Sequence, residues 1–138
     1  MEAVSAQRSA VSKTPLRVKK QKFRQLTIWQ KAMMLITEVY QATAVFPKEE
    51  LYGLTSQLRR AAVSVAMNIA EGSGADTDQE FRRFLVLASR SGYETMCGIE
   101  VAMRLKYLPI DRGERLLNQL EELSAMTHGF VKKLTADR

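Results

Sequence analysis

The sequence predicts an all-α protein, an antiparallel up-down four-helix bundle preceded by a basic N-terminal arm. Apolar residues recur at alternating steps of three and four along four long stretches, which is the period of an amphipathic α-helix. Proline or glycine separates these stretches, and no segment shows convincing strand alternation. Apolar residues make up 46% of the 138 residues, which suits one domain with a real core.

The first predicted helix begins at Thr27 and ends before Pro47. Thr27 and Gln30 have the spacing of a capping box, in which each side chain satisfies a free backbone N–H of the other residue. The residue before a proline disfavours helical angles, so the helix ends at Phe46. The apolar stripe of this helix is expected to consist of Trp29, Met33, Ile36, Tyr40 and Thr43.

The second predicted helix ends at Gly72 and Gly74, because glycine accepts the left-handed angles of a helix end at little cost. The apolar stripe of the second helix is Leu51, Leu54, Leu58, Ala61, Val65 and Ile69.

The third predicted helix opens with a second capping box, Thr77 with Glu80, and runs for about 30 residues. Small residues interrupt its stripe, which indicates close packing against a neighbouring helix. The fourth helix begins at Asp111 and follows a heptad pattern. The third stripe is Phe81, Phe84, Leu85, Ala88, Gly92, Thr95, Ile99, Ala102 and Leu105, and the fourth is Leu116, Leu120, Leu123, Thr127, Phe130 and Leu134.

The formal net charge of +6 belongs to the first 25 residues. This segment holds seven basic residues against Glu2 alone, whereas residues 26–138 hold 14 basic and 14 acidic residues. Residues 1–22 also lack a sustained apolar period, which favours an arm that is disordered or ordered by a partner. The expected organisation is therefore a basic flexible arm over residues 1–25 and a neutral bundle over residues 26–138.

A cationic arm can follow a phosphate backbone, with an affinity that falls as salt rises. Phe23 lies within the densest basic run, where it would stack on an unpaired base or anchor the arm on the bundle. The pairs Arg59-Arg60 and Arg82-Arg83 are secondary candidates, with surface ion pairs as the alternative interpretation. The candidate nucleic-acid-binding residues are Lys13, Arg17, Lys19, Lys20, Lys22, Arg24, Arg59, Arg60, Arg82 and Arg83.

Four polar residues, Asn68, Glu71, Ser73 and Asp76, lie at the end of the second predicted helix. We interpret Asn68 and Glu71 as part of a buried hydrogen-bond network that fixes the register of neighbouring helices. The alternative is a polar ligand pocket.

The residue content argues against an enzyme. Cys97 and His128 are the only cysteine and histidine, which excludes a disulfide framework and a cysteine-rich zinc site within one chain. No glycine-rich phosphate loop and no Glu-x-x-His pair is present. We expect Cys97 to be a buried inert thiol and His128 a packing or surface residue, and we predict no metal and no cofactor.

Neither a membrane span nor a secretory signal is apparent, since no apolar run approaches the roughly 18 residues that a span needs. The lone cysteine suits a reducing compartment. We therefore expect a cytoplasmic protein with no membrane partner.

The segment Gln57-Leu-Arg-Arg-Ala-Ala-Val-Ser64, followed by Asn68-Ile-Ala-Glu-Gly72, resembles the signature of a known family. This is the family of four-helix-bundle proteins encoded in intervening sequences of bacterial 23S rRNA genes, also called the S23 ribosomal protein family. The likeness covers about residues 24–135, and Ala66 stands where the family often has proline. Supporting pieces are the Trp29 helix, Phe46-Pro47, Glu50-Leu-Tyr-Gly-Leu54, Glu80-Phe81, Phe84-Leu85 and Glu94.

The resemblance implies an antiparallel four-helix bundle that assembles into ring-like homopentamers, without an assigned enzymatic activity. It also implies a likeness to the accessory variability proteins of diversity-generating retroelements, which are basic pentamers that bind nucleic acid and a reverse transcriptase. The basic arm is not part of the family core. The substitution at Ala66 predicts a weaker bend in the second helix.

These observations lead to three functional hypotheses. The first is a non-enzymatic homopentameric scaffold that binds nucleic acid, with RNA favoured, in which five arms bring together about +30 charges. The second is an adaptor that binds a reverse transcriptase and its RNA as a retroelement accessory protein. The third is a small-molecule or metal-binding bundle that uses Asn68, Glu71 and His128.

Overall fold

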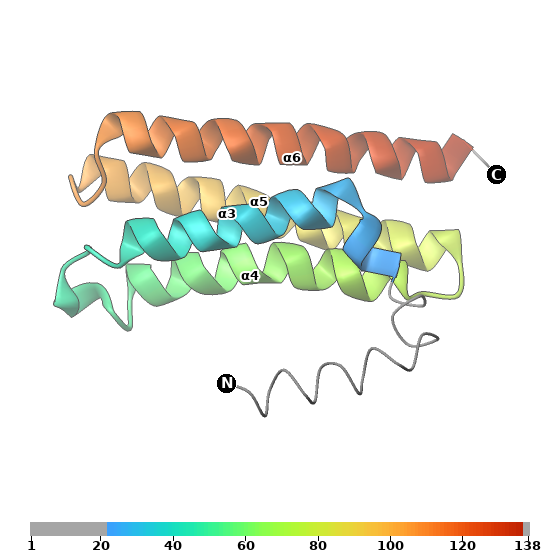
Figure 1. Ribbon diagram of the computed structural model, residues 1–138, viewed down its shortest axis with the longest axis horizontal. Coiled ribbons are helices and arrows are strands. Elements are labelled where there is room, and N and C mark those ends of the chain that lie inside the picture. Colours follow the sequence, from blue (N-terminus) through green and yellow to red (C-terminus); the bar gives the residue numbers. More distant parts are fainter. Residues whose placement is uncertain (1–21, 137–138) are drawn as a thin grey trace, which may run out of the picture.

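The computed structural model describes residues 22–136, which form an antiparallel up-down four-helix bundle (Figure 1). Each helix packs against the next along the chain, and the last packs against the first. No strand occurs in this part of the chain, so the predicted all-α bundle is confirmed. The elements are η1 (Lys22–Gln25), α3 (Thr27–Thr43), η2 (Lys48–Glu50), α4 (Leu54–Ser73), α5 (Asp78–Arg104) and α6 (Ile110–Ala136). None of these helices is long and apolar enough to cross a bilayer.

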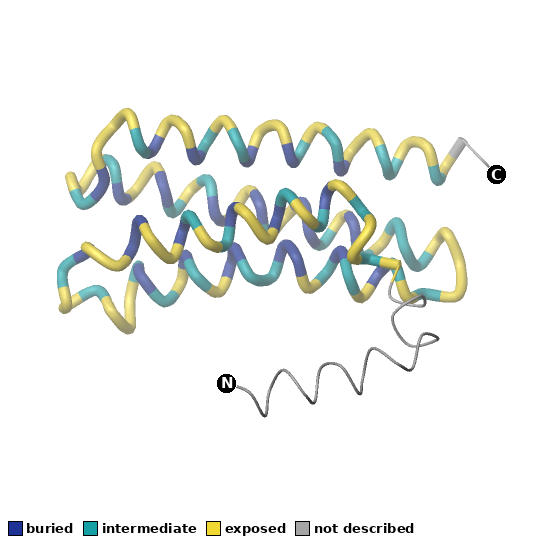
Figure 2. The backbone as a smooth tube through the Cα atoms, viewed as in Figure 1, coloured by how far each residue is buried: buried dark blue, intermediate teal, exposed yellow. Residues whose placement is uncertain are grey.

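The core lies along the axis of the bundle, where the inner faces of all four helices meet (Figure 2). The predicted heptad stripe of α6 is largely confirmed, since Leu116, Leu120 and Leu123 are buried. The central parts of the α4 and α5 stripes are buried as well, whereas Leu51 and Leu105 at their ends are exposed. Periodicity therefore identified the inward faces of three helices.

The predicted stripe of α3 is displaced by one residue from the most buried face of the helix, although Thr43 from that stripe is buried and Trp29 and Ile36 pack against the core. The residues that enter the core are Ile28, Ala32, Leu35, Val39 and Ala42. The predicted set begins one position later, so it is turned by about 100° around the helix. As a result, Met33 and Tyr40 are 41% and 42% exposed. Both sets have helical spacing, and spacing alone cannot choose between two adjacent apolar stripes.

The two predicted capping boxes have different outcomes. At α5 the Thr77 hydroxyl accepts the Glu80 N–H at 3.1 Å, although the Glu80 side chain turns to Arg83 instead of back to Thr77. At α3 the cap is wrong, because Leu26 precedes the helix and supplies no side-chain cap. The Gln30 amide there donates to the Arg24 carbonyl at 2.8 Å, which ties α3 to η1.

Gly72 and Gly74 do not end α4 through left-handed angles. Gly74 has φ −89°, and no glycine in residues 22–136 has a positive φ. Gly72 is buried where α4 approaches α5, and a Cβ at this position would lie 2.7 Å from the Phe84 Cβ. The glycine is therefore required by the close approach of two helices.

The connections at one end of the bundle are joined by Glu50. One carboxylate oxygen accepts the Leu54 N–H at 3.0 Å, at the first turn of α4, and the other accepts the Tyr107 hydroxyl at 3.1 Å. This hydrogen bond to Glu50 raises the pKa of Tyr107. The α3–α4 and α5–α6 connections are thus held together at the end of the bundle opposite to η1.

Candidate nucleic-acid interface

The end of the bundle where η1 lies gathers basic side chains from two elements, η1 and α6. Lys22 and Arg24 are exposed on η1, and Lys132 and Lys133 are exposed in the last turns of α6. Lys133 lines a groove of about 370 Å³ together with Gln25 and residues that follow it. We call Lys22, Arg24, Lys132 and Lys133 the basic end. Sequence reasoning identified the first two but missed the lysines of α6.

The turn η1 is attached to the bundle by an aromatic contact. The Phe23 ring packs edge-on against Trp29, with their centroids 5.0 Å apart, and Phe23 is half-buried. Of the two roles considered for Phe23, the structure therefore supports the anchor. The candidates Lys13, Arg17, Lys19 and Lys20 lie outside the described residues.

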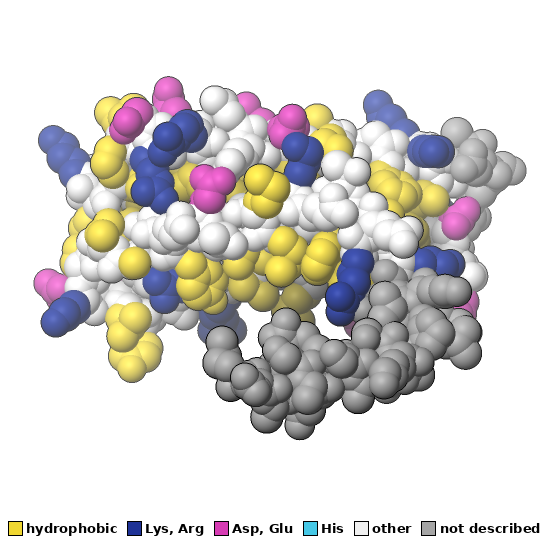
Figure 3. Space-filling view, viewed as in Figure 1, with side chains coloured by type: hydrophobic (Ala, Val, Ile, Leu, Met, Phe, Trp, Pro, Cys, Tyr) yellow, Lys and Arg dark blue, Asp and Glu magenta, His cyan; other side chains and the backbone are white. Residues whose placement is uncertain are grey.

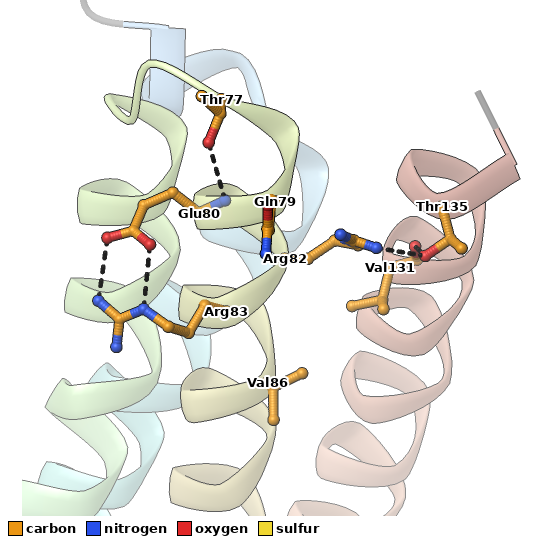
Figure 4. A pocket seen from close by; sticks show the side chains of 8 residues that line it. All are labelled: Thr77, Gln79, Glu80, Arg82, Arg83, Val86, Val131 and Thr135. Carbon is orange, nitrogen blue, oxygen red and sulfur yellow. Dashed lines mark hydrogen bonds and ion pairs between the residues drawn. The ribbon is translucent and has the colours of Figure 1, made fainter. Parts of the chain in front are cut away.

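Arg82 and Arg83 also lie near this end but are occupied within the chain (Figure 4). Arg83 forms two parallel bonds to the Glu80 carboxylate, at 3.1 and 3.0 Å. These bonds lower the pKa of Glu80 and raise the pKa of Arg83. Arg82 reaches across to α6 and donates to the Thr135 hydroxyl at 3.1 Å. Arg83 therefore fits the alternative interpretation of a surface ion pair. Arg82 instead links α5 to α6.

The pair Arg59-Arg60 lies on α4, away from the basic end. The Arg59 guanidinium stacks on the Tyr40 ring at 4.5 Å and donates to the Thr43 hydroxyl at 2.8 Å. Arg60 is exposed and makes no hydrogen bond or ion pair with another described residue. The two neighbours therefore separate into one structural arginine and one exposed arginine.

The predicted polar network is found for Asn68 but not for Glu71. The half-buried Asn68 amide donates to the Ser64 carbonyl at 2.9 Å and to the Ser64 hydroxyl at 3.0 Å. Ser64 in turn lies 2.8 Å from the Ser91 hydroxyl, which links α4 to α5. Glu71 is exposed and forms no hydrogen bond with another described residue, because its helical position points outward. The two serines were not identified from the sequence, since isolated serines carry no spacing signal.

Asn68 and Glu71 instead line a shallow groove of about 440 Å³ on the outer side of α4. Ser73 donates to the Ala70 carbonyl of its own helix at 2.9 Å, and Asp76 is exposed in the turn after α4. The ligand-pocket alternative therefore corresponds to a shallow hollow on the surface of the protein. The lining residues are Tyr40, Arg59, Arg60, Val63, Ser64, Met67, Asn68 and Glu71.

Cys97 is exposed on α5, which corrects the prediction of a buried thiol. His128 is exposed on α6, 3.4 Å from the Ser89 hydroxyl and beside Tyr93. His128 does not line the groove that holds Asn68 and Glu71. In the described part of the chain no group of three His, Cys, Asp or Glu side chains is placed to hold a metal ion.

Comparisons with known proteins give this bundle its family. The family model described as "23S rRNA-intervening sequence protein" matches residues 24–129. The chain belongs to this family. The chain also resembles a crystal structure from Bacteroides thetaiotaomicron, described as a protein with unknown function from the S23 ribosomal protein family. The two share 19% identity and a TM-score of 0.70, over 77% of this chain and 99% of the other. No curated protein matches the sequence.

Proposed function

We propose that this protein is a non-enzymatic, homo-oligomeric scaffold that binds nucleic acid, RNA foremost. The observation that carries the proposal is the distribution of cations. The four side chains of the basic end project from the end of the bundle at which residues 1–21 join it. Those 21 residues add five basic side chains and one acidic side chain. The basic residues of positions 1–21 thus directly precede the basic end along the chain.

The composition of these basic segments fits a phosphate backbone better than a specific base sequence. Lysine and arginine contacts to phosphates supply affinity without reading bases. The lysines at the end of α6, together with the basic residues of the N-terminal arm, would contact a nucleic-acid strand over several nucleotides. Weak contacts of this kind become effective when several copies are joined, because each further arm then binds at a high local concentration. The pentamer that the family resemblance implies is our working number of copies.

The adaptor hypothesis uses the same basic residues and adds a reverse transcriptase as protein partner. A reverse-transcriptase gene and a template repeat beside the coding sequence would favour it. A location of the coding sequence within an rRNA gene would favour the scaffold alone.

Binding of a structured RNA at two salt concentrations tests the proposal. One variant replaces Lys13, Arg17, Lys19 and Lys20 with glutamine, and a second carries Lys132→Glu and Lys133→Glu. Each phosphate contact removed should lower the slope of log affinity against log salt by roughly 0.7–0.9. The control is Lys106→Glu with Arg112→Glu, since these residues lie at the opposite end of the bundle. Equal, salt-insensitive affinities in all four proteins would refute the proposal.

A further inference from the structure

The outer surface between α3 and α4 is apolar, and no other element of residues 22–136 covers it. The misassigned stripe of α3, with Met33 and Tyr40, faces this surface from one side, and Met67 of α4, which is 63% exposed, faces it from the other. Figure 3 shows hydrophobic side chains gathered along the line where α3 and α4 meet. A monomer rarely leaves such a patch in water. We call this surface, with the hollow beside α4, the groove.

A second apolar surface lies on α5. Val86, Tyr93 and Val101 are 41%, 52% and 41% exposed, and the exposed Cys97 lies between the last two. Steps of seven, four and four residues place these side chains on one outward arc of the helix. Because α5 packs against α4 and α6, this arc points away from the groove. We call it the ridge.

The exposed charges of the groove and the ridge follow opposite orders along the bundle axis. Starting from the end where η1 lies, the groove has an acidic and then a basic residue, whereas the ridge has a basic and then an acidic residue. Arg60 and Glu71 border the groove, and Arg90 and Glu100 lie on the exposed side of α5. None of these four residues takes part in the two close ion pairs of residues 22–136, Lys31–Glu122 and Arg83–Glu80, although the charge of Glu71 helps to raise the pKa of Arg83 and Arg60 shares a hollow with Glu94.

The separations of these charges match. The two groove residues are 11 positions apart and the two ridge residues 10 positions apart, which corresponds to about 16 and 15 Å of helix. If α4 of one copy lies antiparallel to α5 of another, Arg60 faces Glu100 and Glu71 faces Arg90. Met67 then meets Tyr93 and Cys97 at the centre.

We propose that the ridge of each copy occupies the groove of the next copy, with these two charge pairs on either side of an apolar centre. The proposal rests on the homo-oligomer of the proposed function and names its two contact surfaces. Within one chain α4 and α5 are antiparallel, so an antiparallel α4–α5 contact between copies leaves the bundles themselves parallel. Every basic end then lies on the same side of the assembly. A contact between two different surfaces also repeats, and it closes into a ring when the rotation allows.

Two single variants and their mixture test the contact. Met67→Glu blocks the groove and Tyr93→Glu blocks the ridge, so each variant alone should fall to the mass of one chain in light scattering or native mass spectrometry. An equal mixture should form pairs of twice that mass and nothing larger, because each variant keeps one usable surface. The control is Met34→Glu, which is 62% exposed on α3 but turned away from the groove, and which should assemble as the natural chain does.

Other outcomes of the mixture overturn the proposal. Assembly of Tyr93→Glu alone would indicate a groove-to-groove contact, and assembly of Met67→Glu alone would indicate a ridge-to-ridge contact. Full assembly of both variants would exclude both surfaces. Circular dichroism should give the same helix content for all variants, since the substituted side chains are exposed.

A charge exchange tests the register. Arg60→Glu should weaken assembly at least tenfold in dissociation constant, and addition of Glu100→Arg should restore it. Glu121→Arg is the control, because Glu121 is exposed on α6 and belongs to neither the groove nor the ridge. Restoration by Glu121→Arg as well as by Glu100→Arg would mean that any added positive charge suffices, and it would overturn the register. A natural chain that stays monomeric at micromolar concentration would refute the homo-oligomer itself, whereas assembly through other surfaces would refute only this contact.

Discussion

The contact between α4 and α5 and the contact between α3 and α6 use different kinds of side chain. Along α4–α5, small residues bring the two helices close, so that a Cβ on Gly98 would lie 2.7 Å from the Leu58 side chain. Along α3–α6, longer polar side chains bridge the gap, with Lys31 Nζ 3.1 Å from Glu122 and the Gln119 amide 2.8 Å from Glu38. Shape therefore specifies the first contact, and adjustable polar pairs specify the second. Substitutions should cost far more at α4–α5 than at α3–α6.

The largest effect is expected at Gly72. In Gly72→Ala the new methyl group meets the Phe84 Cβ and Phe81, which are fixed close to the α5 backbone. We expect a loss of about 1–3 kcal/mol in the free energy of unfolding, typical of an overpacked core, despite the better helix propensity of alanine. Denaturant unfolding measures this loss. Unchanged stability would mean that α4 and α5 separate easily, which would remove the contrast between the two contacts.

The same substitution at Gly129 should have the opposite sign. Gly129 is exposed on α6 near the start of α3, and a Cβ there would meet no heavy atom within 4 Å. Gly129→Ala should therefore raise the free energy of unfolding by about 0.5–1 kcal/mol, the difference in helix propensity. The pair Gly72→Ala and Gly129→Ala is internally matched, since the chemical change is identical. A loss of stability in both variants would contradict the comparison.

A smaller effect is expected where the connections meet. Tyr107→Phe removes the hydroxyl bond to Glu50 and should lower the melting temperature less than Gly72→Ala does. Because that bond raises the pKa of Tyr107, the folded chain holds the phenolic proton more tightly than the unfolded chain. The stability from this bond is therefore complete below pH 10 and is lost as pH rises through the folded-state pKa. Melting curves of both proteins from pH 7 to 11 should converge at the alkaline end, and parallel curves would argue against the bond.

The smallest effect is expected for Lys31 and Glu122. Their side chains are 37% and 60% exposed, so solvent screens the ion pair. A double-mutant cycle with alanine at both positions should give a coupling energy of about 0.5 kcal/mol or less, and it should shrink further in 0.5 M salt. A coupling above about 1 kcal/mol would show that the polar contact between α3 and α6 is as specific as the α4–α5 contact.

Periodicity was sufficient to predict the bundle, because three of its helices have one apolar stripe each. It failed at α3, where Ile28 and Trp29 begin two equally regular stripes and only the position of α4 decides between them. Gly72 was recognised as a helix-end signal, although its role depends on Phe84, a residue that only tertiary structure brings near.

The candidate site was predicted in part for a similar reason. Lys22 and Arg24 stand in a dense basic run, and this local signal is visible in the sequence. Lys132 and Lys133 look like ordinary cations of a final helical turn, where they interact favourably with the helix dipole. Their membership of the basic end depends on the antiparallel order of the helices. Glu71 points outward because α3 and α5 cover the other faces of α4, and this arrangement is not visible in the sequence.

The positions at which the chain enters and leaves the bundle have a practical consequence. Lys22 and the end of α6 lie at the same end of the molecule (Figure 1). A fluorescent or affinity domain fused close after the end of α6 would therefore stand beside the basic end and compete with a nucleic acid for space. An insertion between Val45 and Gly53, whose tip residue Tyr52 is 92% exposed, would carry the reporter on the far end. Labelled proteins for the binding measurements are best built that way.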